Sequence, residues 1–134
     1  MIEQNIGQLE RKISKRIKDL YNDRFGQSPS QIICHFFDTE IVISLENSVT
    51  QAEQTLVKEG YASLAEQVRF YLDRIIKPEL KKLIEEIIGE SIIDLITNTN
   101  LATGRTGIIV VLNQLPEIWN AESITNGNVK YSPD

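Results

Sequence analysis

Residues 49–89 decide the fold, and they read VTQAEQTLVKEGYASLAEQVRFYLDRIIKPELKKLIEEIIG. This stretch is the longest helical pattern in the chain. Thr50 with Glu53, and Ser63 with Glu66, have the spacing of capping boxes, in which a hydroxyl and a carboxylate satisfy the free amides at a helix start. The stretch therefore predicts two successive helices.

Gly60 and Gly89 predict where these two helices end, because glycine readily adopts the left-handed conformation that follows a last helical turn. Apolar residues recur at helical spacing in the second helix and predict one buried stripe. The stripe consists of Leu64, Val68, Leu72, Ile75, Ile76, Leu80, Leu83, Ile84 and Ile87. Pro78 lacks an amide donor, so we expect this helix to kink or divide near Lys77. A helix so apolar on one side needs a sheet or a partner chain to cover it.

The flanking segments supply one more helix and the strands of a sheet. Apolar residues three or four positions apart predict a first helix that ends near Phe25, with Gly26 after it. These residues are Ile2, Ile6, Leu9, Ile13, Ile17 and Leu20. Runs of β-branched and aromatic residues predict strands at 31–37, 40–45, 91–97 and 106–113, and a polar connection joins the last two at 98–105.

The predicted order of elements, α-β-β-α-α-β-β, indicates an α+β fold. We expect a four-stranded antiparallel or mixed sheet with the helices packed mainly on one face. Residues 1–115 are predicted to form a single domain. Residues 116–134 are predicted to form a C-terminal tail that is partly ordered or flexible.

The composition is that of a globular protein with an acidic balance. The chain has 134 residues, a formal net charge of −5, one cysteine and one histidine. The negative charge disfavours nucleic acid as a partner. A single cysteine excludes an intrachain disulfide and fits a reducing compartment. The absence of a signal-peptide pattern and of an apolar run long enough to cross a bilayer favours a cytoplasmic location, with membrane association indirect at most.

The residues that could carry catalysis are few. Cys34 and His35 are neighbours in a predicted strand, so their side chains point to opposite faces and cannot form a dyad with each other. We expect no metal site, no cofactor and no enzymatic activity. The capping role of Glu53 explains that carboxylate. Arg69 could pair with a carboxylate such as Glu66 or Asp73, and it is interpreted as a structural residue unless it lies buried in a pocket.

Three surfaces are candidates for binding. Gly104, Arg105, Thr106 and Gly107 form the one loop that resembles an anion cradle, with a flexible hairpin connection as the alternative interpretation. Ile33, His35 and Phe37 give the first strand a second apolar face, which predicts a dimer or partner interface. The first helix carries a basic surface that could meet an acidic partner, lipid headgroups or RNA, or could simply be solvated; it consists of Arg11, Lys12, Lys15, Arg16 and Lys18.

Several motifs together resemble the MpsC-like family, also known as Na⁺-translocating-system protein C. They are FGQSP at 25–29, LENSVTQAEQTLVKEG at 45–60, VR at 68–69 and PELKKLIEEIIG at 78–89. The most specific element has the form L-T-x-x-E-x-x-L-x-x-x-G and is represented here by Val49, Thr50, Glu53, Leu56 and Gly60. The resemblance implies association with a membrane system that moves sodium or generates membrane potential, with a link to inorganic-carbon supply. It implies no catalytic residues.

These observations favour a non-enzymatic cytoplasmic accessory or regulatory domain that forms a homodimer and contacts another protein, such as a membrane transport subunit. One alternative is a sensor of a small anionic ligand or nucleotide near Arg105. Another is RNA or membrane-surface binding through the basic side of the first helix.

Overall fold

The computed structural model describes residues 5–116, which contain three helices around one sheet. In chain order the elements are α1 (Ile6–Phe25), β1 (Gln31–Phe37), β2 (Glu40–Glu46), α2 (Gln51–Lys58), α3 (Ala62–Ile88), β3 (Ile92–Asn100) and β4 (Arg105–Leu112). The predicted order and the α+β class are confirmed. Ile2 of the first apolar pattern and residues 117–134 of the predicted tail lie outside the described residues.

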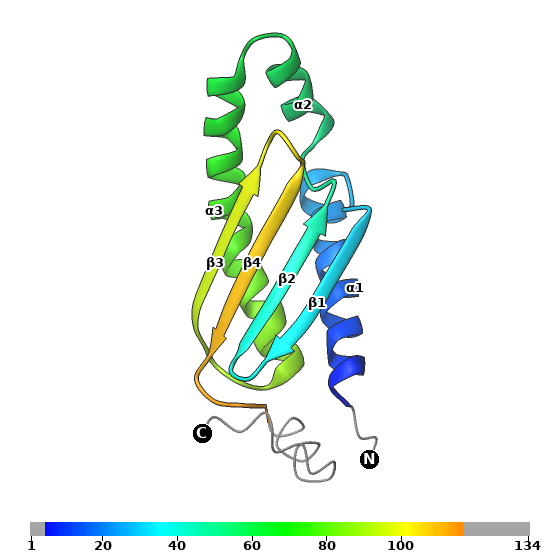
Figure 1. The fold of residues 1–134 in the computed structure, drawn as a ribbon, viewed down its shortest axis with the longest axis vertical. Coiled ribbons are helices and arrows are strands. Elements are labelled where there is room, and N and C mark those ends of the chain that lie inside the picture. The colour runs from blue at the N-terminus through cyan, green and yellow to red at the C-terminus, as the bar shows by residue number, and fades with distance from the viewer. Residues whose placement is uncertain (1–4, 117–134) are drawn as a thin grey trace.

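The four strands form one antiparallel sheet in the order β1-β2-β4-β3, so β1 and β3 are its edges. The helices α1 and α3 lie behind one face of this sheet, and the opposite face is uncovered in the described part of the chain (Figure 1). Alternate residues of every strand point toward the helices, because successive side chains in a strand face opposite sides. They meet the apolar stripes of α1 and α3 in the core, whose fully buried members include Ile13, Ile17, Tyr21, Ile41, Ile43, Leu45, Ile76, Leu80, Ile84 and Ile108.

The capping signals decide where α2 begins and ends. The Thr50 hydroxyl accepts a hydrogen bond from the Glu53 amide, and the Glu53 carboxylate accepts one from the Thr50 amide, so this predicted capping box is confirmed. Gly60 has φ of 96°, the Tyr61 amide donates to the Leu56 carbonyl, and the Gly60 amide donates to the Val57 carbonyl. This is the Schellman pattern of a helix end.

The predicted capping box at Ser63 is wrong. Helix α3 begins at Ala62, with Tyr61 as its N-cap residue and no side-chain cap. The tight end of α2 already directs the Tyr61 carbonyl into the next helix, where it accepts from the Ala65 amide at 3.0 Å. Ser63 therefore lies inside the first turn, where its side chain cannot cap.

Two details predicted for α3 are also corrected. Leu64 and Ile75 are 46% and 51% exposed, so the buried stripe is narrower than the apolar pattern. The helix also continues through Pro78 as one element of 27 residues, so a division near Lys77 is wrong, while the alternative of a kink there stays a prediction. Pro78 is exposed, and the buried residues Ile76 and Leu80 anchor the helix to the core on both sides of it. Packing thus compensates for the missing amide.

The second hairpin is longer than predicted. Strand β3 continues to Asn100, and only residues 101–104 connect it to β4. Thr97 pairs with Ile108 and Thr99 with Thr106, so polar residues expected in the connection belong to the ladder. A strand can hold such residues where one face meets solvent and the other meets polar partners, as Thr99 does in its bond to Asp73.

Candidate functional site

The most unusual feature of the interior is Arg69, a buried arginine in α3 that is 4% exposed. Its Nε and Nη2 atoms donate to the two carboxylate oxygens of Glu53 at 2.8 and 2.6 Å. Its Nη1 donates to Asp73 at 3.1 Å, and Nη2 also donates to the Ser48 carbonyl at 3.1 Å. A two-point guanidinium–carboxylate contact of this kind holds both groups in a fixed orientation. Arg69 thereby joins α2, α3 and the end of the β2–α2 connection.

A chain of hydroxyl groups extends this network into the sheet. Thr106 lies within hydrogen-bond distance of Ser48 at 2.6 Å and of Thr99 at 2.7 Å. Thr99 also donates to Asp73 at 3.3 Å. The network therefore links β3 and β4 to both helices, and its buried polar groups are satisfied by one another.

Burial and ion pairing act together on the pKa values of Asp73 and Arg69. Burial raises the pKa of Asp73, and the nearby Arg69 only partly opposes this. For Arg69 burial alone would lower the pKa, but hydrogen bonds and charges from Glu53 and Asp73 outweigh it and raise the pKa above its ordinary value. Arg69 is therefore a permanent buried cation shared between two carboxyl groups.

A cavity of about 520 Å³ lies beside this network, between α3 and the end of β3. Arg69 and Asp73 line its floor, and Arg74 and Lys77 line its outer part from the same helix. The Oγ1 atom of Thr97, which also lines the cavity, has no hydrogen-bond partner among the described residues. The cavity therefore has a mixed lining, in which charged side chains stand beside Phe70, Leu101 and Ala102.

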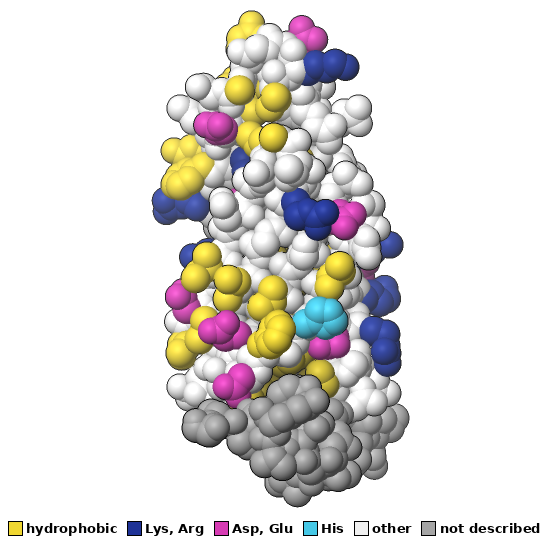
Figure 2. All heavy atoms as spheres, in the orientation of Figure 1, with side chains coloured by type: hydrophobic (Ala, Val, Ile, Leu, Met, Phe, Trp, Pro, Cys, Tyr) yellow, Lys and Arg dark blue, Asp and Glu magenta, His cyan; other side chains and the backbone are white. Residues whose placement is uncertain are grey.

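The interface predicted around Ile33, His35 and Phe37 lies on the uncovered face of the sheet. All three side chains are exposed, and Phe37 is 64% exposed. Figure 2 looks onto this face and shows hydrophobic side chains gathered over its lower half, with the one histidine beside them. The exposure of these three side chains agrees with the alternation of faces along β1, while a role in an interface stays a prediction.

Register shows that this apolar surface extends across the whole sheet. His35 pairs with Val42, Val42 with Ile109, and Ile109 with Ile96, so these residues form one row from edge to edge. Exposed apolar side chains on this face are Ile33, Phe37, Val42, Ile96 and Ile109. An apolar surface of this extent is typical of an interaction site.

The predicted anion cradle adopts a hairpin geometry. Gly104 supplies the positive φ of 75° in the turn, while Arg105, Thr106 and Gly107 belong to β4. Arg105 is exposed and lies 3.4 Å from Glu46, whereas Thr106 is buried on the opposite face. These residues therefore do not converge on one space, and ligand binding by them stays a prediction.

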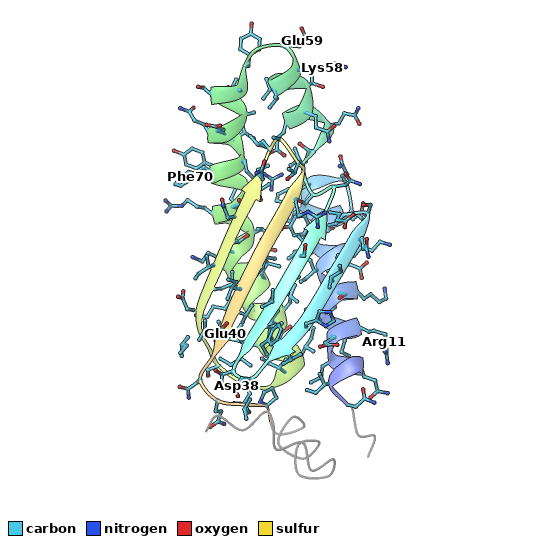
Figure 3. The ribbon with its side chains drawn as sticks, viewed as in Figure 1. Arg11, Asp38, Glu40, Lys58, Glu59 and Phe70 are labelled. Atoms are coloured by element: carbon cyan, nitrogen blue, oxygen red, sulfur yellow. The ribbon has the colours of Figure 1, made fainter. Side chains whose placement is uncertain are left out.

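The basic residues of α1 are exposed, as predicted, but two of them have acidic neighbours. Lys15 lies 3.4 Å from Asp19, and Arg16 lies 3.6 Å from Glu86 of α3. Arg11 projects from the outer side of α1 (Figure 3). Lys12 and Lys18 are likewise exposed. A role in binding for this surface stays a prediction.

Cys34 is buried in the core, while His35 points outward, so the predicted separation of the two side chains is confirmed. Burial raises the pKa of the Cys34 thiol to about 12, and Glu10 adds to this effect. Within residues 5–116 no cluster of three or more histidine, cysteine or carboxylate side chains is placed to hold a metal ion.

The burial of Cys34 can be tested by its rate of alkylation, because it is the single cysteine of the chain. At pH 8 we expect iodoacetamide to modify native Cys34 about a thousandfold more slowly than an exposed thiol, because the thiolate is the reactive form. Mass spectrometry of the intact chain would follow the reaction, and the same chain in urea is the control. Equal rates in the native and unfolded protein would contradict the burial of Cys34.

Sequence reasoning missed the pairing of Arg69 with Glu53. It predicted Asp73 correctly as one partner, but Glu66 is exposed and does not bond Arg69 in the structure. One signal was available: Arg69 lies four residues after Ala65 and seven before Ile76, on the buried side of α3. An arginine in that position requires a buried carboxylate.

The fold and this site define a small α+β domain with one helix-covered sheet face, one open apolar face and an internally paired ionic network. The chain belongs to the family described as Na⁺-translocating membrane potential-generating system (MpsC), whose model matches residues 5–114. The family name links the chain to a sodium-translocating membrane system. No match was found among curated proteins or among solved structures. None of the helices described is both long enough and apolar enough to cross a bilayer.

Proposed function

We propose that this chain is a non-enzymatic accessory subunit that serves a sodium-translocating membrane system from the cytoplasm and works as a homodimer. The observation that carries the proposal is the open sheet face, where a row of side chains crosses all four strands, apolar on β2, β4 and β3 and ending in His35 on β1. Sheets that stack face to face bury such rows at a separation of about 10 Å. A second copy of this chain supplies a surface of matching shape.

Charge supports a second copy as the occupant. Glu46 of β2 and Arg105 of β4 lie side by side at one end of the open face. A two-fold axis parallel to the strands places β2 of one copy over β4 of the other. Each Glu46 then faces Arg105 of the partner subunit, and Val42 faces Ile109 of the partner subunit. The same patch is thus complementary to itself, as a two-fold interface requires.

We also propose that the chain is not an enzyme, because its buried carboxylates are already engaged in hydrogen bonds. Both carboxylate oxygens of Glu53 are bonded to Arg69, and Asp73 is bonded to Arg69 and Thr99. Groups engaged in this way stabilise the fold and are poorly placed to exchange protons with a substrate.

The dimer is tested by two matched substitutions. Val42 on the open face and Val57 on α2 are each 38% exposed, so the two sites are matched in exposure, and circular dichroism checks that both lysine variants fold. We expect Val42→Lys to weaken self-association by about a hundredfold, because it buries an unpaired charge in the interface. Val57→Lys should leave self-association unchanged. Sedimentation velocity measures both.

The accessory role is tested with the same pair in the native host. Loss of the chain should lower the sodium-dependent membrane potential, which a voltage-sensitive dye reports, and the Val57→Lys variant should restore it. The monomeric Val42→Lys variant should restore it poorly. A wild-type chain that stays monomeric at high concentration, or a potential that is unaffected by loss of the chain, would overturn the proposal.

A further inference from the structure

Each edge of the sheet has one backbone amide bonded to a glutamate of a neighbouring helix. At the β1 edge the Phe36 amide donates to the Glu10 carboxylate of α1 at 3.1 Å. At the β3 edge the Ile92 amide, in the first residue of the strand, donates to Glu85 of α3 at 2.9 Å. Beyond it, β4 is the only strand paired with β3 among the described residues. An edge strand of this kind offers a row of free amides and carbonyls.

A groove follows this edge. The cavity of about 520 Å³ is lined from the strand by residues 97–102, and a second cavity of about 310 Å³ is lined by residues 92–95. Lys77 of α3 lines both, so the two cavities are neighbours along one groove between α3 and β3. The upper half of α3 lies beside and beyond β3 rather than behind the sheet (Figure 1), and Phe70 projects from its outer side (Figure 3). The upper half of α3 thus forms a shelf, which no strand within residues 5–116 covers.

The side of α3 that faces the groove carries several basic side chains, although the net charge of the chain is negative. Arg74, Lys77 and Lys81 follow one another along α3 and line the groove, and none of them forms an ion pair among the described residues. Three carboxylates also line the groove: Asp73, which is bonded to Arg69, Glu66 in the larger cavity and Asp94 in the smaller one. Arg74, Lys77 and Lys81 outnumber Glu66 and Asp94, so the groove keeps an excess of positive charge along α3.

We propose that the β3 edge and this groove bind an extended acidic segment of a partner protein as a fifth strand of the sheet. Backbone hydrogen bonds to the edge would supply affinity, and alternate side chains would supply specificity. Acidic side chains on one face of the segment would meet Arg74, Lys77 and Lys81. Apolar side chains on its other face would continue the row that ends at Ile96. A second copy of this chain fits poorly here, because pairing β3 with itself would bring two such basic rows together.

This inference rests on the proposed accessory function and adds how the partner is held. Its test uses a surface other than the dimer interface, so the two can fail separately. The probe is a fluorescein-labelled peptide, TEVEIEVT, whose glutamates lie on one face and whose apolar residues lie on the other. Fluorescence anisotropy with the full-length chain measures binding. Two further peptides carry N-methyl groups on alternate residues, one set on each edge of the strand.

We expect the parent peptide to bind and one N-methylated peptide to bind about tenfold or more weakly, because only one edge of the peptide can pair with β3. The Lys77→Glu, Lys81→Glu double variant should also lose about tenfold or more. Lys12→Glu with Lys15→Glu makes the same change of charge on α1 and should bind normally. No binding of the parent peptide, equal binding of both N-methylated peptides, or an equal loss in the α1 variant would overturn the proposal.

Discussion

Replacing Arg69 by methionine is expected to lower the free energy of unfolding by about 3–5 kcal/mol. The reason is the environment of Glu53, which is 1% exposed and accepts two hydrogen bonds from the guanidinium group. Without Arg69 this carboxylate is a buried, uncompensated charge. Single domains are stable by only about 5–15 kcal/mol, so the loss is a large share of the total. Urea denaturation followed by circular dichroism measures it.

Two further variants separate the buried charge from the loss of side-chain volume. Arg74→Met removes an exposed arginine from the same helix and should cost less than about 1 kcal/mol. The double variant Arg69→Met, Glu53→Met removes both charges and should be more stable than Arg69→Met alone. If Arg69→Met and Arg74→Met are equally stable, the ionic network does not hold α2 and α3 together.

Replacing Leu80 by alanine is expected to cost about 2–5 kcal/mol, the range for deleting a buried leucine side chain. Leu80 is fully buried between α3 and the sheet. Leu64 occupies the same apolar pattern but is 46% exposed, so Leu64→Ala should cost less than about 1 kcal/mol. Both substitutions exchange the same residues in the same helix, so the difference between them reports burial alone.

Thermal and urea unfolding of both variants provide the measurement. Similar losses at the two positions would mean that the upper part of α3 is covered in solution. Such a result would point to a partner or a second copy on the shelf beside β3. A small loss at Leu80 would instead contradict the packing of α3 on the sheet.

The local elements of this fold follow from short-range patterns. The capping box at Thr50 predicts the start of α2, and the glycines after α1 and α3 predict the ends of those helices, because each signal acts within a few positions of the chain. Alternation along β1 likewise predicts which side chains point outward. These patterns are enough for the order of elements and the α+β class.

Tertiary structure decided which residues form pairs and which parts of the sheet stay open. Arg69 bonds to a carboxylate 16 residues away rather than to Glu66, which is nearer in the chain, since only packing brings α2 beside α3. Tertiary structure also decided that β3 is an edge strand, that Ser63 is not a capping residue and that α3 continues through Pro78. Sequence by itself determined the elements, because local backbone geometry and hydrophobic periodicity act between near neighbours. Which residues meet, and which faces remain open, depended on contacts between distant segments that no local pattern contains.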